Sequence, residues 1–396
     1  MKDLRFFTIL ICVFCFCFST IAFASSSGSD IEEPRAQDKH AIILAHGMAA
    51  NEKIFGLVDY YYGVQGWLED KGWTVYQTGD KVSQWNDAMQ KGAEFTDVFY
   101  NEILPRAKAD LGNDVKFHVI GHSHGCLYTR YALSIGSNNN PPIAPYVISH
   151  TSLCGPHRGS TVCDLLFNNR DNIGGIVADV TNMPIIEDVL GWLSIDIVDG
   201  VLDPLFKFLD GVGLEQGEVS ALNNAVNLST YGANFIFNKN VPDAPGVQYQ
   251  SWASTVTGHN PLRGINLVFN PTYGYMRHGT NGDKVENTAQ LYNQLKGPND
   301  PAFNLNNSIN YGGHPTTIAA LLEGYNDGLV DEQSAKWGTY RGLIKGVEID
   351  LLIATVDEGG VDHFQINNNL IGNTPGFSPK DFWVEDLLPT LENYSN

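Results

Sequence analysis

The sequence Gly-His-Ser-His-Gly at positions 121–125 constrains the fold of this chain more than any other segment. It directly follows an apolar run at 115–120 that is typical of a buried strand, and a helical pattern covers about 124–135. A serine at so sharp a strand-to-helix turn exposes its hydroxyl, and the flanking glycines lack the Cβ atoms that would clash there. We therefore predict that Ser123 is a nucleophile, because an ordinary glycine-rich turn would not account for the preceding strand.

Strand-like and helix-like segments alternate through the first 160 residues of the chain. The sequence predicts strands at 41–45, 74–77, 115–120 and 146–153, and helices at 86–111 and 124–135. Further strands are expected at 247–255 and 350–356, with a short helix at 381–391. Such alternation predicts an α/β fold with a mostly parallel sheet and helices on both of its faces.

Composition excludes several classes of protein. Of the 396 residues, 43% are hydrophobic and only 17% are charged, so the chain is not intrinsically disordered. The formal net charge of −20 argues against nucleic acid or anionic lipid headgroups as partners, because electrostatic repulsion would oppose both encounters.

The first 24 residues have the pattern of a targeting segment. Lys2 and Arg5 precede an apolar run at 6–18, and the small-x-small sequence Ala-Phe-Ala at 22–24 precedes a polar stretch. We expect residues 1–24 to be a secretory signal peptide, since the run is shorter than the roughly 20 residues of a membrane-spanning helix. Residues 25–396 are then expected to form a single domain.

Three cysteines lie in that segment and three follow it, namely Cys126, Cys154 and Cys163. In an oxidising compartment, Cys154 and Cys163 could pair and leave Cys126 free. The alternative is that all three are unpaired and pack as small apolar side chains. Their spacing does not resemble a zinc site.

Acyl transfer through a serine also requires two N–H donors for the developing oxyanion. In this architecture, one donor is the amide after the nucleophile, here that of His124. The second comes from the loop after an early strand, and His46-Gly47-Met48 follows the predicted strand 41–45. We therefore predict that the amides of His124 and Met48 form the oxyanion hole.

The order of a serine triad on this architecture is serine, then an acid, then histidine. Only His363, of the eleven histidines, lies near the C-terminus beyond a predicted strand, and we predict it to be the general base. Four aspartates lie in the interval that could supply the acid. Asp362 adjoins the histidine and would point away from Nδ1, whereas Asp327 lies in the turn-like sequence Asn-Asp-Gly. The residues alone leave open the choice among Asp327, Asp331, Asp357 and Asp362.

These motifs resemble those of the secreted bacterial triacylglycerol lipases of the Pseudomonas and Burkholderia type, and the likeness extends over most of the chain. The matching blocks are Leu-Ala-His-Gly-Met at 44–48, the segment 54–63, the turn at 121–125, Gly-Pro-His-Arg-Gly-Ser at 155–160, Ser-Ala-Leu-Asn at 220–223, Tyr-Gln-Ser-Trp at 249–252 and Asn-Asp-Gly-Leu-Val at 326–330. The resemblance implies an α/β-hydrolase fold with Asp327 as the triad acid and a helical lid at about 160–240. It also implies a dedicated folding chaperone as partner.

The chain departs from this family at several positions. The family's structural calcium is held partly by an aspartate two residues after the catalytic histidine, where this chain has Gln365, a weaker neutral ligand. Calcium is thus left open, and no cofactor is expected for the chemistry. The family's disulfide joins an earlier cysteine to one soon after the triad aspartate, and this chain has no cysteine after Asp327. Cys126 stands just after the 121–125 turn, where the family commonly has glycine. The stretch at about 258–316 is predicted to be a loop-rich insertion.

The leading hypothesis is a secreted serine hydrolase that cleaves lipid esters, most simply triacylglycerol, through an acyl-enzyme. An esterase, a phospholipase or an acyltransferase would use the same three residues, and the sequence does not separate them. A binding protein on a degenerate hydrolase scaffold is the remote alternative, against which the complete set of catalytic side chains argues. Apolar residues at 185–208, within the lid-like region, would face either the core or an incoming lipid.

Overall fold

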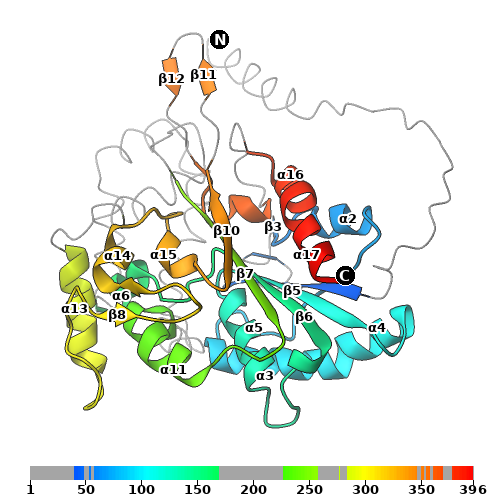
Figure 1. The fold of residues 1–396 in the computed structure, drawn as a ribbon, viewed down its shortest axis with the longest axis horizontal. Coiled ribbons are helices and arrows are strands. Elements are labelled where there is room, and N and C mark those ends of the chain that lie inside the picture. Colours follow the sequence, from blue (N-terminus) through cyan, green and yellow to red (C-terminus); the bar gives the residue numbers. More distant parts are fainter. Residues whose placement is uncertain are drawn as a thin grey trace, which may run out of the picture. The chain divides into compact units, whose positions relative to one another are not determined.

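The computed structural model describes residues 40–48, 53–54, 58–168, 226–256, 276, 283–345, 349–351, 354–356, 360–368 and 377–395. All of these belong to one compact unit, which spans residues 36–396 and is separate by its contacts from residues 1–35 (Figure 1). The predicted signal peptide, most of the predicted lid and much of the 258–316 segment lie outside the described residues.

Six parallel strands form the central sheet, in the order β10-β7-β6-β5-β1-β4 (Figure 1). Their bounds are His40–Ala45 for β1, Thr74–Gln77 for β4, Lys116–His122 for β5, Val147–Leu153 for β6, Gln248–Ser254 for β7 and Thr339–Ile344 for β10. The prediction of a parallel sheet is confirmed. Because all six strands are parallel, their carboxyl ends lie at one edge of the sheet, where loops that carry function can meet.

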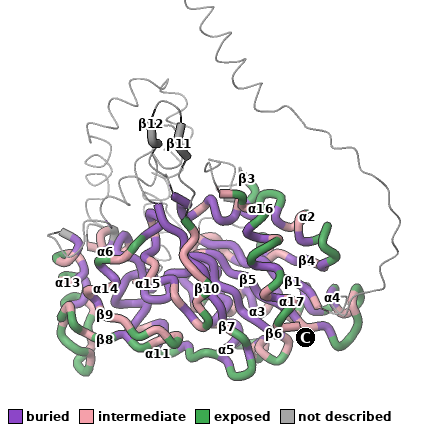
Figure 2. Tube along the Cα trace, turned by 45° about the horizontal axis from the view of Figure 1, so that its top comes forward, coloured by how far each residue is buried: buried purple, intermediate pink, exposed green. Residues whose placement is uncertain are grey.

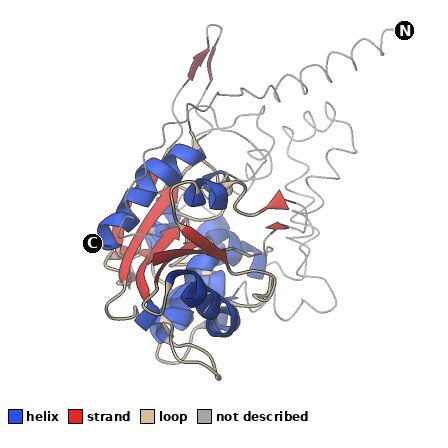
Figure 3. Cartoon of the chain, turned by 90° about the vertical axis from the view of Figure 1, so that its right-hand side faces the viewer, coloured by secondary structure: helices blue, strands red, loops and turns tan. Residues whose placement is uncertain are grey.

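Helices cover both faces of this sheet, which lies between two helical layers in Figure 3. On one face lie α3 (Ala88–Val98), a π-helical turn (Phe99–Ile103), α4 (Leu104–Leu111) and α5 (Gly125–Ser134). On the other lie α2 (Val64–Glu69) and a C-terminal helix composed of α16 (Pro379–Asp381), a π-helical turn (Phe382–Leu387) and α17 (Leu388–Ser395). The C-terminal helix is longer at both ends than the one predicted at 381–391.

The burial pattern explains why β1 and β5 lie at the centre. Ile43 packs with Phe95 and Phe99 on one face, whereas its neighbours Ile42 and Leu44 pack on the other face. Successive side chains of a strand point to opposite faces, so a strand that is covered on both sides needs a continuous apolar run. Figure 2 shows the resulting buried centre of the sheet.

One strand prediction is wrong. Residues 350–356, predicted as a strand upstream of His363, are not a strand of the main sheet; Ile349–Leu351 (β11) and Ala354–Val356 (β12) pair with each other as an antiparallel hairpin. The sixth strand of the sheet is β10, which the sequence prediction missed. Its register shifts between Tyr340 and Gly342, and this partly exposed edge strand lacks the clean apolar run of the central strands.

A second group of helices lies beside the sheet (Figure 1). Its members are α6 (Thr161–Asn168), a π-helical turn (Gly232–Phe237), α11 (Asn238–Asn240), α13 (Asp283–Leu295), α14 (Ile318–Glu323) and α15 (Glu332–Ala335). Residues of α6, the π-helical turn, α13 and α14 share an apolar cluster, whereas Ala335 of α15 packs in a separate one. The helix α13 lies within the segment 258–316 that the sequence predicts to be loop-rich. It was missed because most of its side chains are polar, and only Val285, Leu291, Tyr292 and Leu295 of it join the cluster.

The remaining described elements are short. They are the strand pairs β2 (Lys53–Ile54) with β3 (Val58–Asp59) and β8 (Ser308–Ile309) with β9 (Thr316–Thr317), and the 3-10 turns Ala144–Tyr146 and Gln365–Asn367. Cys126, Cys154 and Cys163 are free thiols, so the pairing of Cys154 with Cys163 does not occur. In the part of the chain that the structure describes, none of the helices has the length and apolar character to span a membrane.

Candidate active site

Ser123 lies at the carboxyl end of β5, between the last residue of the strand and the first residue of α5. Its φ angle is 56°, a left-handed conformation that non-glycine residues rarely adopt. The amide of Ser123 donates to Leu153 O at the end of β6 (2.9 Å), and Ser123 O accepts from Cys126 N in the following helix (3.0 Å). The neighbouring strand and the helix thus hold the strained turn in place.

Two glycines let the strand and the helix approach each other closely. A Cβ atom on Gly121 would lie 2.7 Å from Cys126 N, and one on Gly125 would overlap Ala45 O of the central strand β1. Neither backbone neighbour can move aside without breaking the sheet or the helix. The α/β-hydrolase fold presents its nucleophile at a strained serine turn of this kind, on a parallel sheet covered by helices on both faces. The chain has this fold, and we call the turn at 121–125 the elbow.

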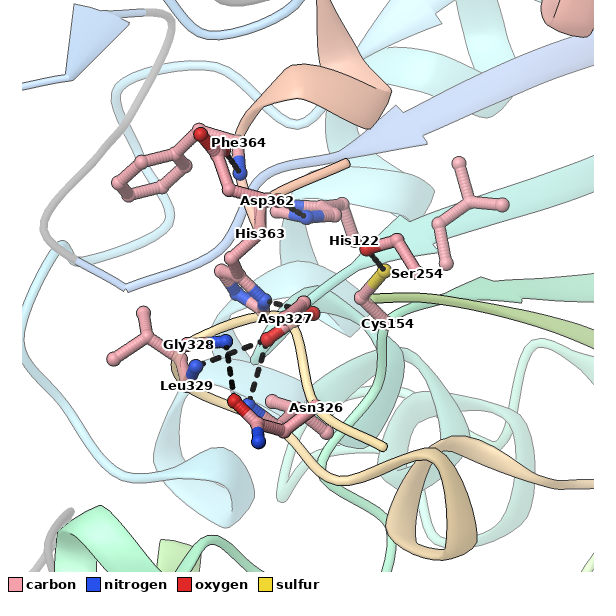
Figure 4. Close-up of polar contacts among 12 residues, drawn as sticks. His122, Cys154, Ser254, Asn326, Asp327, Gly328, Leu329, Asp362, His363 and Phe364 are labelled. Carbon is pink, nitrogen blue, oxygen red and sulfur yellow. Dashed lines mark hydrogen bonds and ion pairs between the residues drawn. The ribbon is translucent and has the colours of Figure 1, made fainter. Parts of the chain in front are cut away.

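His363 and Asp327 form a buried pair beyond the carboxyl ends of the strands (Figure 4). Nδ1 of His363 lies 2.8 Å from Oδ2 of Asp327, and both side chains are 1% exposed. The two backbones are joined as well, because His363 N donates to Asp327 O (3.1 Å). The other carboxylate oxygen, Oδ1, accepts from Leu329 N (3.0 Å) and Val330 N (2.8 Å). These three side-chain bonds fix the orientation of the carboxylate.

His122 connects the elbow to His363. Its Nε2 lies 2.8 Å from His363 O, and the two rings are 4.7 Å apart between centroids. A carbonyl only accepts, so Nε2 of His122 carries the proton and Nδ1 accepts the hydroxyl of Tyr60 at 2.5 Å. Burial and the neighbouring His363 hold the pKa of His122 well below its usual value, so the ring is neutral. Meanwhile Nε2 of His363 makes no hydrogen bond to any described residue.

The other candidate acids have different environments. Oδ1 of Asp362 accepts the amides of Phe364 and Gln365 and so caps the short 3-10 turn after His363. Asp331 precedes α15, is buried, and has no hydrogen bond from the described residues to its Oδ1. Asp357 lies outside the described residues. Among the candidate aspartates that the structure describes, Asp327 is the one that contacts the ring of His363. The positions of the aspartates in the sequence did not indicate this contact.

The loop Gly47-Met48, predicted to contribute an oxyanion donor, lies against the elbow. A Cβ atom on Gly47 would be 3.1 Å from Cβ of Ser123 and would overlap the hydroxyl of Tyr60. Met48 packs next to the apolar cluster of α5. His124, which supplies the other predicted donor, precedes α5, and the first N–H groups of a helix have no intrahelical acceptor. The structure therefore places Gly47, the residue before Met48, against Ser123, and His124 directly after it.

Lys91 contacts the same loop and was missed by the sequence prediction. Its side chain is fully buried in α3, and Nζ donates to Gly47 O at 3.0 Å. The sequence contains a signal for it: Ala88, Phe95 and Val98 are buried at helical spacing, and Lys91 occupies a position in that apolar stripe. A charged residue within such a stripe is unusual enough to indicate a specific role.

Several buried histidines surround the site, all in the neutral form. Burial and the nearby Lys91 lower the pKa of His46 to about 3, and the same two causes hold the pKa of His124 well below its usual value. Neither ring nitrogen of His124 has a hydrogen-bond partner in the described part of the chain. Both rings are therefore neutral and add no positive charge to the elbow.

Sequence comparison identifies relatives with known names, although no family model matches the chain. A triacylglycerol lipase of Burkholderia plantarii is 29% identical over 147 residues, which are 37% of this chain and 37% of that protein. A triacylglycerol lipase of Vibrio cholerae is 25% identical over 276 residues, covering 64% of this chain and 77% of the relative. The chain has triacylglycerol lipases as homologues. Among solved structures, lipase 1 of Pelosinus fermentans superposes with a TM-score of 0.48 at 16% identity, covering 89% of this chain and 98% of that one.

The calcium site that the family resemblance implies does not fit the described residues. Oε1 of Gln365, at the position of the expected carboxylate ligand, accepts the amide of Asp362 (3.0 Å). Among the described residues, one group of three metal-ligand side chains occurs, His122, Cys154 and His363, and it contains no carboxylate. Burial raises the pKa of Cys154 well above its usual value, which disfavours the thiolate that a metal would require.

Proposed function

We propose that this protein is a serine hydrolase that cleaves carboxylic esters, with Ser123 as nucleophile, His363 as general base and Asp327 as the acid that orients it. The observation that carries this proposal is the buried pair of His363 with Asp327. The carbonyl of His363 also accepts a hydrogen bond from the ring of His122, the residue before Ser123. Nε2 of His363 is left available for a substrate-side proton.

The reaction would proceed in two displacements. Ser123 Oγ attacks the acyl carbonyl while its proton passes to Nε2 of His363, and the resulting imidazolium is stabilised by the Asp327 carboxylate. The tetrahedral intermediate then collapses, the ester C–O bond breaks, and His363 returns the proton to the departing alcohol. Water, deprotonated by the same histidine, attacks the acyl-enzyme, and the second collapse releases the carboxylic acid and restores Ser123.

The oxyanion of both intermediates would be bound by backbone N–H groups. We assign this role to the amides of Met48 and His124. Gly47, whose carbonyl shares a peptide group with the Met48 amide, lies against Ser123, and His124 follows Ser123 before α5. The N-terminus of α5 adds a favourable dipole at the same place. Because the neighbouring histidine rings are neutral, charge stabilisation would come from these amides and from the helix dipole.

For the substrate class we propose lipid esters such as triacylglycerols, on the strength of the homologues that carry this name. The net charge of −20 favours a neutral ester droplet over an anionic surface. We further propose export after cleavage behind residue 24, and folding assisted by a dedicated chaperone. N-terminal sequencing of the exported protein and expression with no added partner in a heterologous host test these two points.

The decisive experiment measures hydrolysis of p-nitrophenyl esters of graded chain length by the wild type and by Ser123→Ala. We expect long acyl chains to be preferred and the variant to lose several orders of magnitude in kcat. Ser149→Ala, which removes a buried serine hydroxyl that bonds His118 on the neighbouring strand β5, is the matched control. Equal rates for the wild type and Ser123→Ala would discard the mechanism, and a preference for short soluble esters would replace the lipid substrate by a simple ester.

A further inference from the structure

The position of Lys91 calls for an explanation beyond folding. Its side chain is fully buried, and no carboxylate among the described residues lies within ion-pair distance of Nζ. Its contacts are the carbonyl of Gly47 at 3.0 Å and the face of the Tyr128 ring, whose centroid is 4.9 Å away. A buried ammonium group without a counter-ion is costly to folding, so a methionine of similar size would stabilise the helix better.

The protonation state of Lys91 does not affect its contact with Gly47. Burial lowers the pKa of Lys91 to about 7, although the nearby Glu94 opposes that shift. Both the ammonium and the amine carry N–H donors, and a carbonyl oxygen accepts from either form. The hydrogen bond to Gly47 O is therefore available on both sides of neutral pH.

The carbonyl that Lys91 holds belongs to the same peptide group as the amide of Met48. A trans peptide group is planar, with its C=O and N–H pointing in opposite directions, and the described chain contains no cis peptide bond. An anchor on Gly47 O therefore sets the direction of the Met48 N–H. Nδ1 of His46 lies 3.0 Å from the same oxygen and supports the same orientation.

This peptide group needs an external anchor because residue 47 must be glycine. Any Cβ atom there would overlap the hydroxyl of Tyr60 and crowd Ser123. Glycine rotates more freely about its backbone than any other residue, so the local sequence does not itself fix the direction of the amide that follows.

We propose that Lys91 is a positioning residue for the oxyanion hole, which holds the Gly47–Met48 peptide group so that the Met48 N–H faces the acyl oxygen of the substrate. This inference rests on the proposed ester hydrolysis. It assigns to Lys91, from the helix α3 behind the site, the task of orienting this donor together with the ring of His46.

The test compares Lys91→Met and Lys91→Gln with the wild type on a p-nitrophenyl ester. Loss of one oxyanion donor costs about 10²–10³ in kcat, so a donor that has lost its anchor should cost about 10- to 100-fold. We expect KM to stay within about threefold, because the donor acts on the transition state more than on the bound ester. The unfolding temperature of Lys91→Met should equal or exceed that of the wild type, since a buried charge is removed.

Lys91→Gln retains an N–H donor without the charge and is expected to keep more of kcat than Lys91→Met. Lys116→Met is the matched control, since Lys116 also donates to a backbone carbonyl, that of Pro145 at 2.6 Å, but lies at the opposite end of β5 from the elbow. Its kcat should be that of the wild type.

Three outcomes would overturn the inference. The first is an unchanged kcat in Lys91→Met while Ser123→Ala is inactive. The second is an equal loss of kcat in Lys91→Met and Lys91→Gln. The third is a loss of kcat in Lys91→Met that is accompanied by a lowered unfolding temperature. Each of these leaves the proposed hydrolysis intact. Absence of ester hydrolysis in the wild type would instead remove the proposed function and this inference together.

Discussion

Nδ1 of His363 and Oδ2 of Asp327 lie 2.8 Å apart, and a second bond joins the backbone of the same two residues. Asp327 follows a buried helix and a loop, whereas His363 follows the hairpin β11–β12, so separate parts of the chain supply the two halves of the pair. Oδ1 of the aspartate is occupied by two backbone amides. The carboxylate therefore presents its remaining oxygen to the ring in one orientation only.

Replacing the aspartate of this pair should disable the histidine. In Asp327→Asn an amide N–H faces Nδ1, so the ring would adopt the wrong tautomer, with the proton on Nε2. We expect kcat for ester hydrolysis to fall by about 10⁴. Asp362→Asn makes the same chemical change at the residue next to His363, but its Oδ1 still accepts the two amides of the 3-10 turn, and kcat should change less than about threefold. A drop of less than tenfold in Asp327→Asn would contradict the assignment of the acid.

The close contact at the elbow predicts that Gly125 tolerates no side chain. In Gly125→Ala the new methyl group would overlap Ala45 O in the central strand, and backbone atoms cannot move aside as a flexible side chain can. We expect a loss of about 3 kcal/mol or more in the free energy of unfolding, measured with urea, together with loss of esterase activity.

Gly66→Ala serves as its control. Gly66 lies in α2, and a Cβ atom there would have no atom within 4 Å. Alanine at an open helical position should stabilise the protein by about 0.5–1 kcal/mol. The elbow argument fails if the two alanine variants unfold at the same urea concentration.

The three cysteines outside residues 1–24 should titrate as thiols. The protein lacking residues 1–24 is denatured without added reductant. Ellman's reagent should then detect Cys126, Cys154 and Cys163 as three free thiols. In the native protein the reaction should be slow, because Cys126 and Cys154 are fully buried and burial raises the pKa of each. Reductant should leave the unfolding temperature unchanged. A single reactive thiol in the denatured chain would indicate a disulfide instead.

Acid should destabilise the protein from about pH 6.5 downward. Burial lowers the folded-state pKa of six histidines, so that the unfolded chain binds protons that the folded chain does not, and the stability present above pH 6.5 is lost as pH falls toward 3. The histidines are His46, His118, His122, His124, His150 and His157. Each contributes about 1.4 kcal/mol per pH unit within its window.

Three buried aspartates oppose this effect. Burial raises the pKa of Asp164 to about 6, of Asp362 to about 7 and of Asp331 to about 8, so each binds its proton more tightly in the folded state and stabilises it as pH falls toward 4. Six groups against three leave a net fall of about 4 kcal/mol per pH unit between pH 6 and 4. Urea midpoints measured at intervals of half a pH unit test the slope.

A variant separates the two contributions. Asp164→Asn retains a side chain that can bond Thr230 and Thr288 but no longer titrates. The acid limb of its stability curve should therefore be steeper than that of the wild type by about 1.4 kcal/mol per pH unit between pH 6 and 4. A shallower limb, or a wild-type curve that rises toward pH 5, would show that the buried histidines do not govern acid stability.

The sequence was sufficient for features that depend on neighbouring residues. The apolar runs of β1 and β5 predicted central strands, because only a strand buried on both faces needs such a run. The Gly-His-Ser-His-Gly turn predicted the elbow, because both glycines are required by contacts within a few ångströms of the serine. The strand β10 was missed because an edge strand with a bulge carries no comparable apolar pattern.

The tertiary structure alone decided which distant side chains meet. Four aspartates were candidates for the triad acid, and nothing in the local sequence distinguishes a carboxylate that faces an imidazole from one that caps a turn, as Asp362 does. The position of Lys91 in the apolar stripe of α3 indicates burial, but its contact with Gly47 exists only because α3 packs behind the loop after β1. Local periodicity determines which residues form a strand or a helix. The direction in which a buried polar group points depends on partners far away in the chain, and these are set only when the sheet and its helices are assembled.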